Sequence, residues 1–447
     1  MKTFFLGAVL SLLTMAASPV VHAAHKMNAF RLDNGLQLVV IEDRRSPAIS
    51  QTLWYRVGAA DEPPGKSGIA HYVEHLMFKG TRNFAPGFYR QTVQNLGGND
   101  NAFTSRDSTG YIQRIAADHL ETIMELEADR MHNLILTDDD IETERRVVLE
   151  ERNMRTDTNP GALLSEQMSA SLYLNHPYSI PIIGWRHEIE QLSRDDIFDF
   201  YKTHYAPNNA ILVIAGDIAP HEALRLAQEH YGPLQANPHI KTRIRPQEPP
   251  HLAERRLVMT DERIATPYIV RRYLASERNP GEQRTAASLS LLAAILGGDG
   301  INSFLTQKLE IEANISIYSS AYYRGTSVDP TGFGLVVVPA DSVTMQEAEE
   351  ALDEALDEFL QTGVEEAQLN RIKKGIYAAN IYEQDSVQSV ARRVGEALSS
   401  GLTLEDVRVW PDILQSVTAA EILDAARSLF RPESSVTGWA LNEDIES

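Results

Sequence analysis

Two histidines, His71 and His75, stand four residues apart in the stretch GKSGIAHYVEHLMFKGT, and Glu74 directly precedes the second. On a helix this spacing places both imidazoles on one face, about 40° apart, while the apolar residues of the stretch can pack on the opposite face. Two such imidazoles can bind one zinc ion, and a neighbouring carboxylate can act on a water molecule there. Alone, the pattern is equally compatible with an amphipathic helix that happens to carry histidines.

A third ligand is available in the acidic segment 138–155, which reads as a helix opened by aspartates. Glu151 lies only about 20° round this helix from Glu144, whereas Glu150 points away. Apolar neighbours predict that the shared face is buried, namely Ile141, Val147 and Val148. Buried carboxylates are costly unless they are paired or bind a metal, although a solvated acidic helix is the alternative. Two histidines and one glutamate would leave a fourth position open, which is the catalytic arrangement.

The segments around these residues predict a mixed scaffold. Alternating or continuous apolar runs predict strands, and longer amphipathic stretches predict helices. The predicted strands are 36–43, 49–58, 109–118, 268–275 and 333–340. The predicted helices are 119–134, 138–155, 282–296, 344–361 and 365–398. Strands and long helices in both parts of the chain predict an α+β fold of two domains, each a mostly antiparallel sheet covered by helices on one face.

The two parts share a repeated pattern. Segments 192–217 and 417–442 each contain a helix N-cap residue, an amphipathic helix, an aromatic residue, a proline and an apolar strand. Ser193 corresponds to Thr418 and Tyr205 to Phe430 at one constant offset, so duplication explains the pattern better than chance. The proline-rich and charged stretch between the parts predicts a linker. The predicted division is 24–242 for the metal-binding domain, 243–256 for the linker and 257–447 for a metal-free homologous domain.

Composition narrows the class of function. At 447 residues the chain predicts two or more domains, and its formal charge of −21 argues against binding nucleic acid, which needs clustered cations. The absence of cysteine excludes thiol catalysis and disulfides. The acidic excess is compatible with basic or extended substrates.

Residues 1–23 have the pattern of a secretory signal peptide. Lys2 precedes an apolar run. The run ends in the pattern of a cleavage site, in which two small residues, Val21 and Ala23, are separated by one other residue. An uncleaved membrane anchor is the alternative. No later segment approaches the roughly 20 apolar residues of a membrane span. We therefore expect a protein exported across the inner membrane, with a bacterial periplasm as the expected destination.

The stretch GAADEPPGKSGIAHYVEHLMFKGT, followed by ERRVVLEE, resembles the signature of the pitrilysin/insulinase family of zinc metallopeptidases, which includes mitochondrial processing peptidase. GGNDNAFTSRDSTGY, HPYSIPIIGW and LGGDGINSF also resemble family segments, and the likeness covers nearly the whole chain after residue 23. The resemblance implies that His71, His75 and Glu151 bind one zinc ion. It also implies that Glu74 is the general base and that Glu144 orients a ligand from behind.

The family resemblance also points to a substrate strand. Asn101, Ala102 and Phe103 match a segment that forms a sheet edge near the metal in the family. A substrate peptide would add to this edge as a further strand, held by backbone hydrogen bonds. Ordinary strand packing is the alternative for each of the three side chains.

One family feature is missing. Active members use an arginine and a tyrosine seven residues apart to bind substrate, but Glu310 and Ile317 occupy those positions here. Tyr318 is one residue off, and Arg324 lies too far along the chain. The family includes heteromeric pairs in which one subunit carries zinc and the other this pair. We therefore expect a hetero-oligomer with a homologous partner that carries the pair, with a homodimer as the other possibility.

The resemblance implies a zinc-dependent endopeptidase that hydrolyses extended oligopeptides or unfolded segments. Two domains would form half of a clam-like chamber, and a partner chain would supply the other half. A non-proteolytic assembly or scaffold subunit of the same fold is the competing interpretation. Such subunits usually lose metal ligands, whereas all four metal-site residues are present here, which favours the enzyme.

Overall fold

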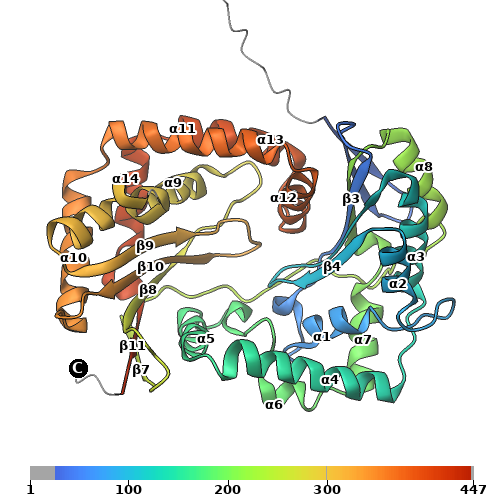
Figure 1. Cartoon of the computed structure of the whole chain (residues 1–447), viewed down its shortest axis with the longest axis horizontal. Coiled ribbons are helices and arrows are strands. Elements are labelled where there is room, and N and C mark those ends of the chain that lie inside the picture. The colour runs from blue at the N-terminus through green and yellow to red at the C-terminus, as the bar shows by residue number, and fades with distance from the viewer. Residues whose placement is uncertain (1–25, 299, 444–447) are drawn as a thin grey trace, which may run out of the picture.

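The computed structural model describes residues 26–298 and 300–443, so the predicted signal peptide lies outside it. It contains two separate sheets (Figure 1). The strands of the first are β1 (Met27–Arg31), β2 (Gln37–Glu42), β3 (Ala48–Tyr55), β4 (Asn99–Thr104), β5 (Thr109–Ala116) and β6 (Ala210–Gly216). Those of the second are β7 (Arg255–Thr260), β8 (Tyr268–Ala275), β9 (Ser316–Tyr323), β10 (Thr331–Pro339) and β11 (Ser435–Leu441). Among the described residues, no helix is both long and apolar enough to cross a membrane.

Helices pack around both sheets, and we call residues 26–242 the N-half and residues 257–443 the C-half. The N-half contains α1 (Ile69–Leu76), α2 (Phe88–Asn95), α3 (Leu120–His132), α4 (Asp138–Arg152), α5 (Pro160–Leu172), α6 (Arg186–Ile189), α7 (Arg194–His204) and α8 (Pro220–His230). The C-half contains α9 (Arg284–Ala293), α10 (Met345–Thr362), α11 (Glu366–Glu383), α12 (Val387–Ser399), α13 (Leu404–Ser416) and α14 (Ala419–Leu429).

The two sheets have the same topology. The first has the order β1-β2-β6-β3-β5-β4 and the second β7-β11-β8-β10-β9. Each sheet contains one parallel pair (β2 with β6, β7 with β11) and is otherwise antiparallel. Among the described strands, β1 alone has no counterpart. The edge strand β4 therefore corresponds to β9. The predicted α+β fold with two homologous halves is confirmed.

The repeated unit found in the sequence has one structure in both halves. Ser193 and Thr418 are N-caps with reciprocal capping-box hydrogen bonds, which satisfy free N–H groups at the starts of α7 and α14. Tyr205 and Phe430 are the residues at which these helices end. A short 3₁₀ turn then leads into β6 and β11, the strands that pair in parallel with β2 and β7.

Each half packs one of its helices on the sheet of the other half, which the sequence did not predict. Helix α12 of the C-half packs on β3 and β6 of the N-half, while α5 of the N-half packs on β11 (Figure 1). The expectation of sheets covered on one face is therefore wrong, because each sheet is covered on both. Strand β2 has four consecutive buried residues, and such a continuous apolar run indicates two-sided burial.

One predicted helix is wrong, because the chain breaks it to reach the other half. Segment 365–398 is two helices, α11 and α12, separated at residues 384–386. Ser386 caps α12 by accepting a hydrogen bond from the Ser389 amide. The break turns the chain so that α12 reaches the first sheet, where Val390, Ala391 and Val394 are buried.

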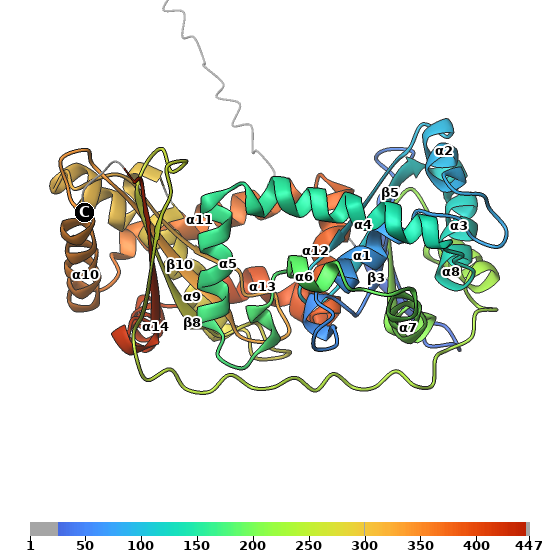
Figure 2. The ribbon, with the colours of Figure 1, turned by 90° about the horizontal axis from the view of Figure 1, so that it is seen from below.

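The linker also joins the halves. Figure 2 shows it extended along one side of the molecule between α8 and β7. Arg245, which is only 6% exposed, pairs with Asp61 (2.9 Å) and Asp107 (2.6 Å) of the N-half and with Asp329 (2.8 Å) of the C-half. His176 lies 3.2 Å from the same Asp329 carboxylate. One buried arginine thus ties both halves together.

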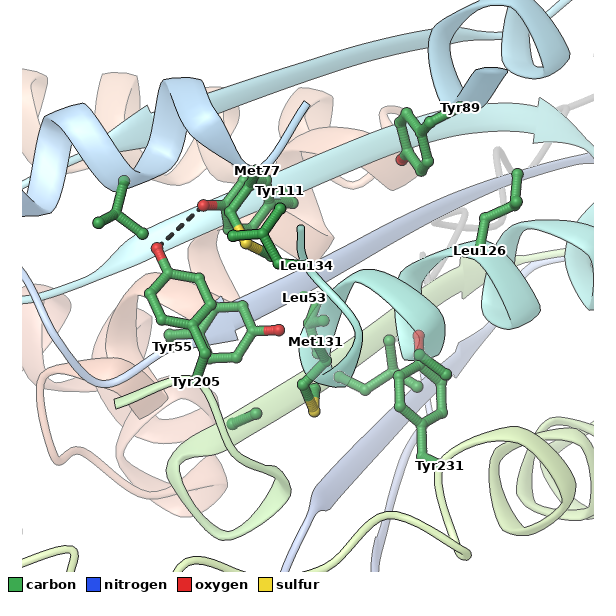
Figure 3. Packing of buried hydrophobic residues seen from close by; sticks show 14 of the residues in the cluster. Leu53, Tyr55, Met77, Tyr89, Tyr111, Leu126, Met131, Leu134, Tyr205 and Tyr231 are labelled. Carbon is green, nitrogen blue, oxygen red and sulfur yellow. Dashed lines mark hydrogen bonds between the residues drawn. The ribbon is translucent and has the colours of Figure 1, made fainter. Parts of the chain in front are cut away.

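On the face of the first sheet that α1 and α7 cover, the core of the N-half is rich in tyrosine. Tyr55, Tyr111 and Tyr205 are fully or almost fully buried there, and the Tyr111 and Tyr205 hydroxyls lie 2.9 Å apart (Figure 3). Met77, just after α1, belongs to the same cluster. The core therefore supports α1 from behind.

Candidate metal centre

Helix α1, which carries both histidines, is anchored at its beginning by carboxylates. Gly68 is the N-cap, with φ of 84°, a left-handed conformation that favours glycine. Glu62 accepts hydrogen bonds from the backbone N–H of Gly68 (3.0 Å) and of Ala70 (2.9 Å). Glu188 accepts one from the Ser67 N–H at 2.7 Å. These bonds satisfy amides that a helix leaves free and complement its positive end, so they fix where α1 begins.

The structure brings the three predicted ligands together. The Oε2 atom of Glu151 lies 3.3 Å from His75 Nε2 and 3.7 Å from His71 Nε2. A four-coordinate zinc with bonds of about 2.0–2.2 Å keeps its donor atoms roughly 3.4 Å apart. All three donor atoms lie within 4.8 Å of one another. The donor set therefore fits one tetrahedral ion with a position left open.

Glu144 supports this arrangement through His75. Its Oε1 lies 2.9 Å from His75 Nδ1, and its Oε2 accepts from Lys79 Nζ at 2.7 Å. Burial acts to raise the pKa of Glu144, but the hydrogen bonds from His75 and Lys79 outweigh it and lower the pKa to about 2. The carboxylate is thus ionised and holds the Nδ1 proton, which leaves Nε2 to face the metal position.

The two histidines differ in charge without a metal. Burial, followed by the charge of His75, lowers the pKa of His71 to about 4, so this imidazole is neutral and ready to ligate. Burial disfavours the charged form of His75 too, but hydrogen bonds to Glu144 and Glu151 raise its pKa to about 9. A metal must therefore displace one proton from His75.

Glu74 is placed for acid–base chemistry beside the three donors. Its Oε2 accepts a hydrogen bond from the Thr104 hydroxyl at 2.6 Å, at the end of β4. Burial raises the pKa of Glu74, and the bond from Thr104 partly opposes this. A carboxylate with a raised pKa is a better proton acceptor near neutral pH.

These residues line a cleft of about 1440 Å³ between α1, α4 and β4. Asn101, Ala102 and Phe103 line it as well, and β4 is the edge of the sheet. Asn101 is exposed. The Phe103 ring packs edge-on against Trp54 at 4.9 Å and lies under the Arg392 guanidinium of α12. The edge can accept a further strand, while the Phe103 side chain contributes packing between the halves.

Helix α4 presents its faces almost as expected. Ile141 and Val148 are buried, Glu150 is exposed, and Glu144 and Glu151 are largely covered. The prediction that Val147 is buried is wrong, because this side chain is 46% exposed and lines the cleft. The carboxylate face of α4 is therefore a cleft wall.

The positions where the family carries arginine and tyrosine do not reach the cleft. Glu310 accepts a hydrogen bond from Ser319 at 2.5 Å, and Ile317 and Tyr318 are exposed on β9, the edge of the second sheet. None of them, nor Arg324, is among the residues that line the cleft. Within the described residues, the C-half brings no arginine–tyrosine pair to the metal position.

Sequence reasoning missed three polar residues of the site. Lys79 binds Glu144, Arg155 binds Glu151 at 2.8 Å, and Thr104 binds Glu74. Lys79 and Arg155 each follow a ligand by four residues, so helical periodicity could have indicated them. Thr104 has no such signal, because it reaches Glu74 from a separate strand.

Comparison with known proteins places the chain in a family. Residues 38–185 match the model described as insulinase (peptidase family M16), and residues 191–376 match the model described as the M16 inactive domain. The zinc protease PqqE of Helicobacter pylori is 31% identical over 392 residues, which are 85% of this chain and 85% of that protein. The chain belongs to peptidase family M16, and the predicted pitrilysin/insulinase membership is confirmed.

Two further likenesses differ in how much of the chain they cover. The crystal structure of a protease from Helicobacter pylori aligns with a TM-score of 0.86 and 26% identity over 93% of this chain and 99% of that one. The β subunit of mitochondrial processing peptidase from Bos taurus is 32% identical over 219 residues, 49% of this chain and 44% of the subunit. The first likeness spans both halves, whereas the second covers about half of each chain.

Proposed function

We propose that the chain is a zinc-dependent endopeptidase that hydrolyses extended oligopeptides or unfolded segments. The observation that carries this proposal is the cluster of His71, His75 and Glu151 donors with Glu74 beside them in one cleft. The spacing of the donors suits zinc, and relatives are named zinc proteases. When bound, one zinc ion would act as a Lewis acid on the water and the peptide carbonyl.

Side chains of the protein then have distinct tasks. Glu74 takes a proton from the attacking water and passes it to the leaving amine. Glu144 holds the Nδ1 proton of His75 and so keeps that imidazole oriented. A substrate peptide pairs with the free edge of β4 along Asn101, Ala102 and Phe103, so binding depends on backbone hydrogen bonds more than on sequence.

A second subunit completes the site in this proposal. The described residues of the C-half bring no arginine–tyrosine pair to the cleft, and one relative is named as a subunit, the β subunit of mitochondrial processing peptidase. A homologous partner carrying the pair would close the other half of a clam-like chamber. A homodimer is the variant to be tested against it.

We also propose where in the cell the protein acts. The signal-peptide pattern of residues 1–23 supports export across the inner membrane into a bacterial periplasm. Residues 24–242 would then form the metal-binding domain, 243–256 the linker and 257–447 the metal-free domain.

The alternative is a non-proteolytic scaffold subunit of the same fold, and one family model that matches is described as an inactive domain. The experiment measures zinc content and cleavage of a quenched fluorescent peptide by the chain alone, with Glu74→Gln and His71→Ala beside it. Zinc in the wild type and in Glu74→Gln, but not in His71→Ala, supports the site. If the wild-type chain alone cleaves the peptide and Glu74→Gln does not, the chain is a self-sufficient enzyme.

If the zinc-loaded wild type does not cleave the peptide, proteins that copurify with it from the native host are tested next as partners. Cleavage that appears with a homologous partner supports the heteromeric enzyme. A chain that binds no zinc, or stays silent with its partner, supports the scaffold.

A further inference from the structure

The two oxygen atoms of Glu151 have different partners. Oε2 faces the histidines, 3.3 Å from His75 Nε2 and 3.7 Å from His71 Nε2. Oε1 forms an ion pair with Arg155 Nη1 at 2.8 Å, one helical turn further along. The guanidinium attracts the oxygen that faces away from the histidines, so it favours one orientation of the carboxylate.

The backbone that carries Arg155 is anchored from inside the protein. The chain from Asn153 to Asp157 forms a π-helical turn directly after α4. Arg152 is buried beneath it and donates to Glu166 at 2.9 Å, while its Nε lies 3.2 Å from Asp157. The position of the turn is therefore set by buried contacts, and π-helical turns of this kind are frequent at functional sites.

A carboxylate can bind a metal through one oxygen or through both. Binding through both would add a further donor beside the water that a hydrolytic site holds in its open position. We infer that Arg155 is a positioning residue, which occupies Oε1 of Glu151 so that only Oε2 is offered to the metal. This inference rests on the proposed zinc site, but not on the presence of a partner subunit.

The contribution of Arg155 to folding should be small. Its side chain is 74% exposed, and exposed ion pairs add little to stability. Removal of its charge should therefore alter the geometry at the metal while the unfolding temperature stays the same. This separates positioning from a general structural role.

The test uses Co²⁺ in place of zinc, because the intensity of its visible absorption reports whether the ion has four ligands or more. The full chain after residue 23 is stripped of metal, loaded with Co²⁺ and compared with Arg155→Met and Arg155→Lys. Arg146→Met is the matched control, since Arg146 lines the same cleft but its hydrogen bond goes to the Glu142 carbonyl.

We expect an intense four-coordinate spectrum for the wild type and Arg146→Met, and a weaker spectrum for Arg155→Met as Glu151 adds its second oxygen. Arg155→Lys, which keeps a cation, should lie closer to the wild type. Loss of cobalt binding by Arg155→Met, with an unchanged unfolding temperature, would overturn the inference, because Arg155 would then be needed for binding itself and not for the number of ligands. A spectrum of Arg155→Met identical to the wild type overturns the inference, whereas a wild type that binds no cobalt overturns the proposed site itself.

Discussion

Gly395 of α12 lies directly against the indole of Trp54 on β3, across the boundary between the two halves. A Cβ atom built on Gly395 would come within 2.0 Å of Trp54 Nε1. Both residues are buried, and α12 supplies the second face of the first sheet. The absence of a side chain at one position therefore lets a C-half helix complete the N-half core.

Substitution of Gly395 should weaken this contact. Gly395→Leu is expected to lower the free energy of unfolding by about 1–3 kcal/mol, because the indole and the helix must move apart. The matched control is Gly375→Ala on α11, where nothing lies within 4 Å of the added methyl group. It should raise stability by roughly 0.5–1 kcal/mol through helix propensity. Urea unfolding measures both, and equal effects would contradict the packing argument.

The N-half should not fold alone. A fragment of residues 24–242 would expose the apolar face that α12 covers, which includes Trp54, Ile211 and Val213. We expect this fragment to aggregate or to lack a cooperative unfolding transition, as seen by light scattering and thermal melts. A monomeric fragment with a sharp transition would show that the proposed division at 242 marks an independent unit.

The Asp329 contact between the halves should make stability depend on pH. Burial acts to raise the pKa of Asp329, but hydrogen bonds from His176 and Arg245 outweigh it and lower the pKa below its usual range. A carboxyl with a depressed pKa stabilises the fold above its unfolded value, and this stabilisation is lost as pH falls through the folded value.

Asp329→Asn should therefore cost about 2 kcal/mol of unfolding free energy near pH 7. The difference from the wild type should narrow below about pH 3.8. Chemical denaturation over the acidic range in which the wild type stays folded measures it. A difference that does not change with pH would argue against the ion pair.

Glu144 should tune metal affinity. Glu144→Gln removes the charge that holds the Nδ1 proton of His75, and loss of such a partner typically weakens metal binding ~10–100-fold. Competition with a chromophoric zinc chelator gives the dissociation constant. Glu150→Gln is the control, because this exposed carboxylate lines the same cleft. Similar losses in both variants would point to a general charge effect.

Thr104 should set the acid limb of the pH–rate profile. Its hydroxyl lowers the pKa of Glu74, which burial raises. Thr104→Val removes the bond, so the pKa of Glu74 should rise further and the acid limb of kcat/KM should move to higher pH. The profile of the active form, with a partner if one is required, measures the shift. A shift to lower pH would contradict the proposed role of Glu74.

The sequence by itself determined the local pattern of the site. His71, Glu74 and His75 lie within five residues, and Glu144 and Glu151 are seven apart, so helical periodicity alone predicts which side chains share a face. The repeat around Ser193 and Thr418 likewise follows from local capping and apolar spacing. These features depend on neighbours along the chain, and a single sequence contains that information.

Only the tertiary structure decided which segments meet. Thr104 reaches Glu74 from another element, Arg245 joins aspartates of both halves, and α12 covers a sheet formed far earlier in the chain. The apolar faces of α12 and of β3 are visible in the sequence, but each of them could pack against any other apolar face of the chain. The partner is chosen by packing between distant residues such as Gly395 and Trp54, which no local period encodes.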